Sequence, residues 1–260
     1  MAITLRSPRE IELMRRAGAV LADVLLKLKE IAEPGVTTGQ LDGIASQMTA
    51  EAGAEALFKG VRTPTSKIPF PGVICASINE QVVHGIPSED TALKEGDILS
   101  IDFGVRLDGY CADAAVTIAI GQIAEDKRRL MDVTEHVLDI AIAKCAPTVK
   151  WSQVAAEMQR YAESAGFSVV RDFVGHGIGR KMHEEPRVPN FVNNDLLAND
   201  IVLAEGMVLA VEPMINAGTA TVRTLSNGWT VVTKDRKCSA HFEHTIAIVE
   251  NGCEVMTVKR

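Results

Sequence analysis

The stretch LSIDFGVRLDGYCADAAVT, residues 99–117, carries the pattern from which the fold can be worked out. It reads as two apolar strands joined by a tight turn at Asp108-Gly109, a dipeptide typical of two-residue hairpin loops. Two more acids, Asp102 and Asp113, lie inside the strands and fall opposite each other or one pair apart when the hairpin is folded. Cross-strand neighbours have Cβ atoms about 5 Å apart, so two ionised carboxylates there would repel each other. The hairpin therefore needs a shared proton, a basic partner or a metal cation between these acids.

The whole chain has the composition of a cytosolic globular protein. Its 260 residues are 47% hydrophobic, which suits one large domain or two small ones with a sizeable core. The net charge of −7 disfavours binding to nucleic acid through bulk electrostatics. The five cysteines are odd in number and lack a C-x-x-C spacing, so reduced thiols are expected rather than disulfides or a zinc knuckle. No apolar run approaches the ~20 residues of a membrane span, and MAITLRSPRE has no signal-peptide core, so a cytoplasmic location is expected.

Helix and strand signals alternate in two rounds along the chain. Ser7-Pro8-Arg9-Glu10 is a capping box that predicts the start of a first helix, and Pro34-Gly35 predicts its end. Gly18 falls on the apolar stripe of that helix, where its small size would allow another element to pack closely. The pattern predicts further helices at about 38–52, 126–145 and 152–165, strands at about 73–121 and from 168 onward, and an irregular loop at 59–72.

The order of these signals indicates an internal duplication. PGVTTGQLDGIASQMTAEAG (34–53) aligns with PTVKWSQVAAEMQRYAESAG (147–166), GDILSID (96–102) aligns with GMVLAVE (206–212), and HGI occurs at both 84–86 and 176–178. Any two amphipathic helices look alike, but three matches in the same order favour duplication. We predict an α+β fold and one domain, 1–260, with halves of approximately 1–121 and 122–260. Each half would hold two helices and a bent antiparallel sheet, with a cleft about a pseudo-twofold axis.

The duplication favours a metal cation as the partner of the buried acids. Glu212 aligns with Asp102, Glu243 lies in the β-rich stretch HFEHT, and His176 lies between two glycines. Singly, each could be a turn residue or a solvated strand residue. Together they suggest four acids and one histidine at the cleft, where two divalent cations would cancel the charge. Oxygen ligands with one imidazole suit Mn, Fe, Co or Zn.

Longer motifs resemble those of the type I methionine aminopeptidases, which are pita-bread metallopeptidases. The resemblance covers nearly the whole chain and rests on IELMRRAG (11–18), SINEQVVHGIP (77–87), GDILSIDFGVRLDGYCADAA (96–115), GHGIGRKMHEEP (175–186), EGMVLAVEPM (205–214) and GWTVVTKDRKCSAHFEHTI (228–246). It implies the pita-bread fold, with an active site in the central cleft. It also implies hydrolysis of the first peptide bond, which removes the N-terminal methionine of nascent proteins and peptides that have a small second residue.

The resemblance further implies two divalent metal ions per chain (Co, Mn, Fe, Zn or Ni) and a role for each residue that matches a motif. The implied metal ligands are Asp102, Asp113, His176, Glu212 and Glu243. Asp113 and Glu243 would bridge the ions, Asp102 would complete one site, and His176 and Glu212 would complete the other. The implied catalytic residues are His84, His183 and Glu212. The two histidines would contact the substrate, and Glu212 would carry the proton between water and product.

The methionine pocket is expected to differ in its lining from that of other members. Cys75 and Trp229 match the family, whereas the usual tyrosine motif is missing from VRTPTSKIPFPGVICASIN (61–79), where Phe70 would take its place. Met182 stands where the family often has phenylalanine. A hydrophobic pocket discriminates by only ~1–3 kcal/mol per methylene, so these differences bear on strictness for methionine.

The expected partners are the N-termini of nascent polypeptides, with the ribosome as a candidate location, and the expected state is a monomer without nucleic-acid or membrane partners. Two alternatives remain open from the sequence. One is a proline-specific aminopeptidase or dipeptidase of the same fold, although such relatives usually carry a large N-terminal domain. The other is an inactive member that only binds peptides, although all five ligand positions are kept.

Overall fold

The computed structural model describes residues 3–64 and 66–259. Its helices are α1 (Pro8–Ile31), α2 (Thr38–Glu51), α3 (Glu125–Lys144), α4 (Trp151–Ser164) and α5 (Asn194–Ala198). The four long helices confirm the predicted ones to within two residues at the N-terminal ends. The short helix α5 was not predicted, because five residues are too few to establish a helical period.

The hairpin predicted for residues 99–117 is formed by β4 (Ile98–Leu107) and β5 (Tyr110–Ala119). Asp108 and Gly109 both have positive φ, 50° and 80°, as a two-residue type I′ turn requires. This turn pairs Asp102 with Ala115, and Asp113 with Gly104. The two acids thus lie on the same face but two positions apart, which corrects the expectation of an opposed or adjacent pair. Diagonal neighbours are about 7–8 Å apart, which leaves room between the carboxylates.

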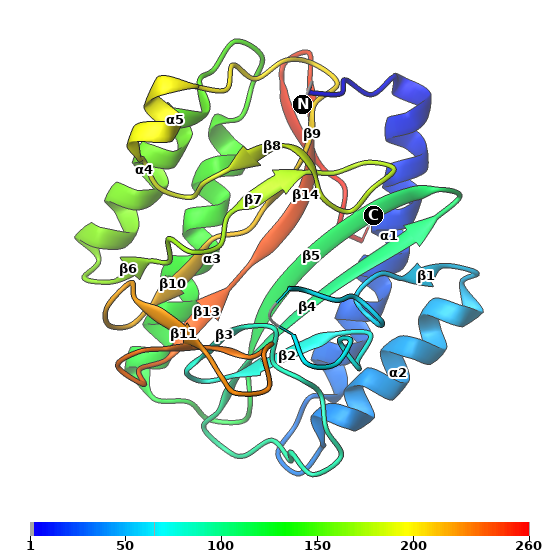
Figure 1. Ribbon diagram of the computed structural model, residues 1–260, viewed down its shortest axis with the longest axis vertical. Coiled ribbons are helices and arrows are strands. Elements are labelled where there is room, and N and C mark those ends of the chain that lie inside the picture. Colours follow the sequence, from blue (N-terminus) through cyan, green and yellow to red (C-terminus); the bar gives the residue numbers. More distant parts are fainter. Residues whose placement is uncertain (1–2, 65, 260) are drawn as a thin grey trace.

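The remaining strands extend this hairpin into a large curved sheet with two small sheets beside it (Figure 1). They are β1 (Glu55–Ala56), β2 (Cys75–Ile78), β3 (Gln81–Val83), β6 (Ser168–Val169), β7 (Gly175–Gly177), β8 (Glu184–Val188), β9 (Val208–Val211), β10 (Met214–Asn216), β11 (Val222–Thr224), β12 (Val231–Thr233), β13 (Ser239–His241), β14 (Glu243–Val249) and β15 (Gly252–Val255). The main path through the large sheet is β1-β4-β5-β14-β9-β7-β8, and its pairings are antiparallel.

The sheet order shows the pseudo-twofold arrangement of a pita-bread fold. Strands β5 and β14 pair at the centre, β4 and β9 flank them, and β2 and β7 pair with the outer edges of β4 and β9. The aligned helices α2 and α4 are both 14 residues long. Asp102 lies in β4, and Glu212 directly follows β9, so the predicted correspondence puts one acid on each side of the centre. The precise boundary between the halves at 121 and 122 stays a prediction.

The helices cover one face of the large sheet, which leaves the other face for the cleft. In Figure 1, α1 lies behind β4 and β5 with α2 at the lower right, whereas α3 lies behind the strands at the left of the view and α4 lies at the left edge. Two large clusters of buried apolar residues lie between the helices and the sheet. One lies under α1 and α2, and the other lies under α3 and α4. In the part of the chain that the structure describes, no helix is both long enough and apolar enough to cross a bilayer.

The start of α1 has the predicted capping box, in which Ser7 and Glu10 each satisfy the other's backbone N–H. Gly18 packs where the C-terminal segment passes over the helix. A Cβ at this position would lie 2.2 Å from the main-chain oxygen of Met256, so only glycine permits this approach. The segment at Met256 therefore packs directly against the backbone of α1.

Candidate active site

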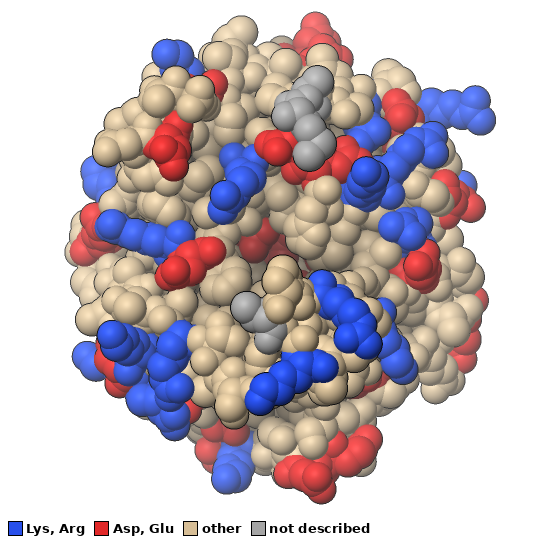
Figure 2. All heavy atoms as spheres, in the orientation of Figure 1, with Lys and Arg blue, Asp and Glu red and all other residues tan. Residues whose placement is uncertain are grey.

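One cavity of about 120 Å³ brings together all of the site residues predicted from the sequence. They are His84, His183, Glu212, Cys75, Phe70, Met182, Trp229, Asp102, Asp113, His176 and Glu243. Figure 2 shows the corresponding face hollowed near its centre, with acidic side chains visible inside the hollow. The predicted site is therefore one place in the fold, although the roles of its residues stay predictions.

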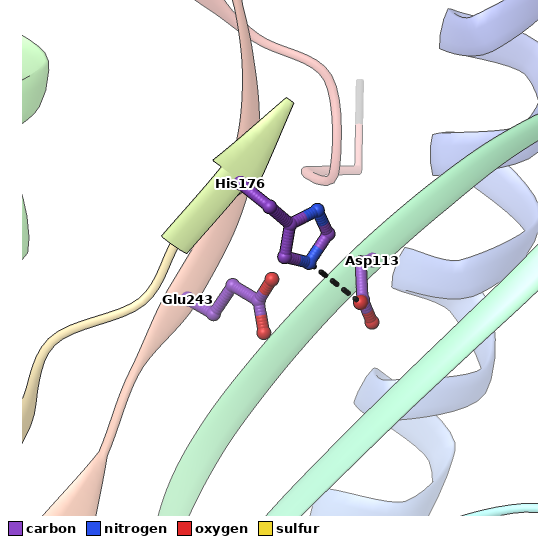
Figure 3. A group of neighbouring side chains, drawn as sticks. All are labelled: Asp113, His176 and Glu243. Atoms are coloured by element: carbon purple, nitrogen blue, oxygen red, sulfur yellow. Dashed lines mark ion pairs between the residues drawn. The ribbon is translucent and has the colours of Figure 1, made fainter. Parts of the chain in front are cut away.

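The tightest group in the cavity consists of Asp113, His176 and Glu243, which point toward one another from β5, β7 and β14 (Figure 3). One potential ligand atom from each lies within 4.8 Å of the others. The Nε2 atom of His176 is 3.8 Å from Asp113 Oδ2 and 3.6 Å from Glu212 Oε1. Asp102 lines the same cavity from β4, next to this group.

The two glycines beside His176 bring neighbouring strands close to it. A Cβ on Gly175 would lie 2.3 Å from the main-chain oxygen of Ala210, and one on Gly177 would lie 2.2 Å from that of Glu185. Larger residues would push β7 away from β9 and β8. The glycines thus allow His176 to reach the acids of the central strands.

Three carboxylate oxygens in the cavity lack hydrogen-bond donors. Among the described residues, Asp102 Oδ1, Asp113 Oδ1 and Glu243 Oε1 are buried without any hydrogen-bond partner. A buried carboxylate oxygen without a partner costs free energy unless a proton or a cation satisfies it. The donor set, carboxylate oxygens with one imidazole nitrogen, fits a divalent transition metal.

Burial and mutual repulsion favour the protonated form of each acid. Burial raises the pKa of Asp102 from 3.8 to about 7. Burial and the charge of Asp102 raise the pKa of Asp113 well above its usual value. Burial and the charges of Asp102 and Asp113 likewise raise the pKa of Glu212 well above its usual value. Burial, followed by the charges of Asp113, Glu212 and Asp102, raises the pKa of Glu243 well above its usual value. A divalent cation would reverse these shifts, because it favours the ionised forms.

Burial favours the neutral form of the histidines in the cavity. Burial and the neighbouring His183 lower the pKa of His176 to about 4 and that of His84 to about 4. The Nδ1 atom of His176 is 2.9 Å from the carbonyl oxygen of Gly177, a contact that places the ring hydrogen on Nδ1. The lone pair of Nε2 then faces Asp113 and Glu212, where a cation could bind.

The backbone ladder of β5 with β14 consists of Glu243 with Ala115 and His244 with Ala114, and two threonine hydroxyls extend this connection, one within β14 and one to the end of β13. At one end, Thr245 Oγ1 accepts from Asp113 N (3.0 Å) and donates to Asp113 O (2.8 Å). At the other end, Thr117 Oγ1 accepts from His241 N (2.9 Å) and donates to His241 O (2.8 Å). These four bonds, which we call the threonine seam, fix the backbone of Asp113 and of the segment that leads to Glu243.

An apolar wall forms the rest of the cavity. The rings of Phe70 and Trp229 meet edge to face at 5.2 Å, and Trp229 Nε1 donates to Ile68 O. Phe58, Val61 and Phe173 also line the cavity and were not predicted from the sequence. Phe58 and Val61 lie at the start of the irregular loop, where no periodicity indicates which side chains turn inward. Only the folded loop places them beside Phe70.

Comparison with known proteins points to one family. The sequence model of metallopeptidase family M24 matches residues 12–250. The methionine aminopeptidase of Clostridium perfringens is 47% identical over 256 residues, which cover 98% of this chain and 99% of that protein.

The comparison of structures agrees. The crystal structure of methionine aminopeptidase from Thermotoga maritima superposes with a TM-score of 0.93 at 38% identity, covering 99% of this chain and 100% of the other. The prolidase from Pyrococcus furiosus has a TM-score of 0.77 at 20% identity, with 98% of this chain and 66% of the prolidase covered, a likeness that concerns the fold alone.

Proposed function

The chain belongs to metallopeptidase family M24, and from this premise we propose that it is a methionine aminopeptidase. It hydrolyses the first peptide bond of proteins and peptides that begin with methionine, with preference for a small second residue, and it depends on divalent metal. The observation that carries this assignment is the group of unpaired carboxylate oxygens and one imidazole beside an apolar cavity large enough for a single side chain.

Five side chains would hold two divalent ions. Asp113 and Glu243, which lie at the central strand pair, would serve both ions. Asp102 would complete the site on the side of the first half, and His176 and Glu212 would complete the site on the other side. The buried oxygens without hydrogen-bond donors support this assignment. Co, Mn, Fe, Zn and Ni all suit the donor set, so the metal's identity is open.

Divalent ions bound there would polarise the first peptide carbonyl and make water a stronger nucleophile near neutral pH. Glu212 would take the proton from the water and return it to the leaving amine, because its Oε1 lies next to the ligand His176 and its side chain lines the cavity. The carboxylates near Asp102 would bind the free α-amine of the substrate. An enzyme that must pair this amine acts only at a chain end.

His84 and His183 would hold the peptide group in place. Because His84 is neutral at pH 7, it presents one donor and one acceptor nitrogen, and it can bond the substrate or pass a proton to the leaving amine. Burial also lowers the pKa of His183, whose ring centroid is 4.4 Å from that of His176. His183 would donate a hydrogen bond to the peptide group that is cleaved.

The methionine side chain would bind against the apolar wall. Phe70, Cys75, Met182 and Trp229 line the cavity beside the acids, with Cys75 directly opposite Asp102 in the sheet, and the wall offers the methionine sulfur atom aromatic edges to contact. Burial and the charges of Asp102 and Asp113 raise the pKa of the Cys75 thiol well above its usual value, so Cys75 would act as an apolar contact rather than a nucleophile.

The same proposal also covers the partners, the location and the oligomeric state of the enzyme. The partners would be the N-termini of nascent polypeptides, with the ribosome as a candidate location, in the cytoplasm. The enzyme would work as a monomer with a single catalytic domain, 1–260, built from the halves 1–121 and 122–260.

Peptide assays and metal titration test this function. Protein stripped with a chelator and reloaded with Co or Mn should release methionine from Met-Ala-Ser and leave Ala-Pro-Ala intact. Calorimetric titration should find two ions per chain. Preferential cleavage of Ala-Pro-Ala would assign the proline-specific activity instead, and failure to bind any divalent ion would remove the metallopeptidase assignment altogether.

A further inference from the structure

A polypeptide substrate must leave the catalytic cavity, and an open groove adjoins this cavity. A groove of about 730 Å³ shares three lining residues with the cavity, namely Phe173, His176 and His183. None of the apolar wall residues Phe70, Cys75 and Trp229 lines this groove. A substrate whose first side chain lies against the wall would therefore pass the two histidines and enter the groove.

The groove continues over β8 toward α5. A second groove, of about 370 Å³, shares Val174, Glu185 and Arg187 with the first and reaches Leu196 of α5. Strand β8 is five residues long, and at about 3.3 Å per residue an extended peptide of about five residues would match its length. The two grooves together thus form one track from the cleft across the last strand of the sheet.

Arg187 occupies the middle of this track. It pairs across β7 and β8 with His176, and directly opposed residues point to the same face of a sheet. Arg187 is exposed, whereas its neighbours Pro186 and Val188 are buried. Its guanidinium group therefore lies on the side of the sheet that carries the catalytic cavity, close to the point where the substrate leaves it.

Most other cations of the track already have partners. Arg6 pairs with Glu184, Arg171 lies 3.8 Å from Glu163, and Arg180 donates to the hydroxyl of Tyr110 at 2.7 Å. In the described chain, Arg187 has no hydrogen bond or ion pair through its side chain, and the same holds for Lys181, which lies beside His183. The guanidinium group of Arg187 is thus free to bind a substrate carboxylate.

Acidic residues also face the track, and they limit where a carboxylate can bind. Asp172 and Glu185 line the first groove, and Asp195 lines the second. A substrate carboxylate would be repelled beside these acids and attracted beside Arg187. The charge preference is therefore expected at particular positions of the substrate rather than along its whole length.

We propose that this track binds the substrate residues that follow the first two, and that Arg187 makes the enzyme favour acidic residues there. The inference rests on the proposed aminopeptidase function and extends it from the first peptide bond to the sequence downstream. Arg187 would determine specificity and would take no part in the chemical step.

Two hexapeptides of matched length and one tripeptide test the proposal with the metal-loaded, full-length enzyme. The substrates are Met-Ala-Ser, Met-Ala-Ser-Glu-Glu-Ser and Met-Ala-Ser-Lys-Lys-Ser, and the readout is kcat/KM for methionine release. Because an exposed ion pair is weak, the wild type should prefer the glutamate peptide to the lysine peptide by about three- to tenfold. Arg187→Glu should reverse this preference, and Arg187→Lys should retain most of it.

Arg128→Glu is the matched control, because Arg128 is an exposed arginine on α3 that lines neither groove. It should keep the wild-type preference. Equal kcat/KM for both hexapeptides in the wild type, or the same ratio in Arg187→Glu, would overturn the proposal even if Met-Ala-Ser is cleaved. Cleavage of none of the three peptides would overturn the proposed function as well.

Discussion

Asp113 and Glu243 are each only 2% exposed, yet both carry an oxygen without a hydrogen-bond donor. Ordinary buried carboxylates are paired or hydrogen-bonded, because an isolated charge in a protein interior is costly. At these two residues the fold keeps the oxygens free and holds them beside His176. Buried carboxylates without hydrogen-bond donors lower the stability of the metal-free fold, but they are suited to binding a cation.

Removal of either charge tests this interpretation. Asp113→Asn and Glu243→Gln should each reduce kcat by more than the 10- to 100-fold seen when an outer partner of a metal ligand is lost. The measurement is methionine release from Met-Ala-Ser together with metal content by elemental analysis. Glu250→Gln, just beyond the end of β14, is the matched control and should behave as the wild type. Full activity in Asp113→Asn would contradict the two-metal arrangement.

The raised pKa of Asp102 predicts how the stability of the metal-free protein depends on pH. Because the folded pKa, about 7, lies above the ordinary 3.8, this group stabilises the fold at low pH and loses that contribution as pH rises through 7. Between pH 5 and pH 8 the chelated wild type should therefore lose about 2–3 kcal/mol of stability relative to Asp102→Asn. Urea unfolding at both pH values measures the difference. A constant difference would show that Asp102 does not titrate in this range.

At the scale of secondary structure elements, the central strand pair matters most, because it joins the two halves and carries two of the proposed ligands. Only two residue pairs connect β5 and β14 by their backbones. The threonine seam extends the connection on both sides through hydroxyl groups. A hydroxyl that replaces a main-chain partner leaves the strands free to diverge, which the cleft between the halves requires.

Thr245→Val removes the hydroxyl but keeps the shape of the side chain. The backbone N–H and C=O of Asp113 would then lack partners, at a cost of about 1–3 kcal/mol, and we expect metal affinity to fall by about 10- to 100-fold. Thr245→Ser should restore the affinity. Thr134→Val is the control, since it removes a buried hydroxyl bond within α3 and should leave metal affinity unchanged. Calorimetric titration reports the affinity, and equal affinity in Thr245→Val would exclude a positioning role.

Helix α1 offers a second test at this scale, with a matched pair of glycines. Gly18→Ala would place a Cβ against the main chain at Met256 and should destabilise the protein by about 1–3 kcal/mol. Gly43 of α2 has open space around its Cα, so Gly43→Ala should stabilise by about 0.5–1 kcal/mol through helix propensity. Thermal unfolding of both variants gives the comparison. Equal effects would show that α1 does not pack as the structure has it.

At the scale of the whole molecule, the acids repel one another across the boundary between the halves. Asp102 and Asp113 come from the N-terminal hairpin, whereas Glu212 and Glu243 follow or begin strands near the C-terminus. Without a cation, this repulsion works against closing the two halves on each other. A bound cation would attract all four carboxylates and so join the halves.

Metal should therefore raise the melting temperature, and more so at higher pH. A ligand at one hundred times its Kd stabilises the folded state by about 2.7 kcal/mol. Because the four acids have raised pKa values, binding at low pH must displace protons, and the gain in Tm on adding Mn should be larger at pH 8 than at pH 6. Differential scanning calorimetry measures both. The Asp113→Asn variant should show a smaller gain, and an equal gain would place the metal elsewhere.

Local signals predicted most of the elements. Short stretches of sequence predicted the capping box at Ser7, the Asp108-Gly109 turn and the aligned helices α2 and α4. Helix caps, turns and amphipathic faces depend on residues that are near neighbours in the chain. The resemblance of the longer motifs supplied the metallopeptidase assignment and named the residues that the cavity later gathered.

The sequence by itself thus determined the two rounds of helix and strand, and it predicted which residues carry the chemistry. Only the tertiary structure decided that Asp102 and Asp113 lie diagonally rather than opposed, that Phe58, Val61 and Phe173 face the cavity, and that Thr245 binds Asp113. The reason is physical: these contacts join residues far apart along the chain or inside an irregular loop. No local pattern encodes them, and they form only when the two halves pack around a common cleft.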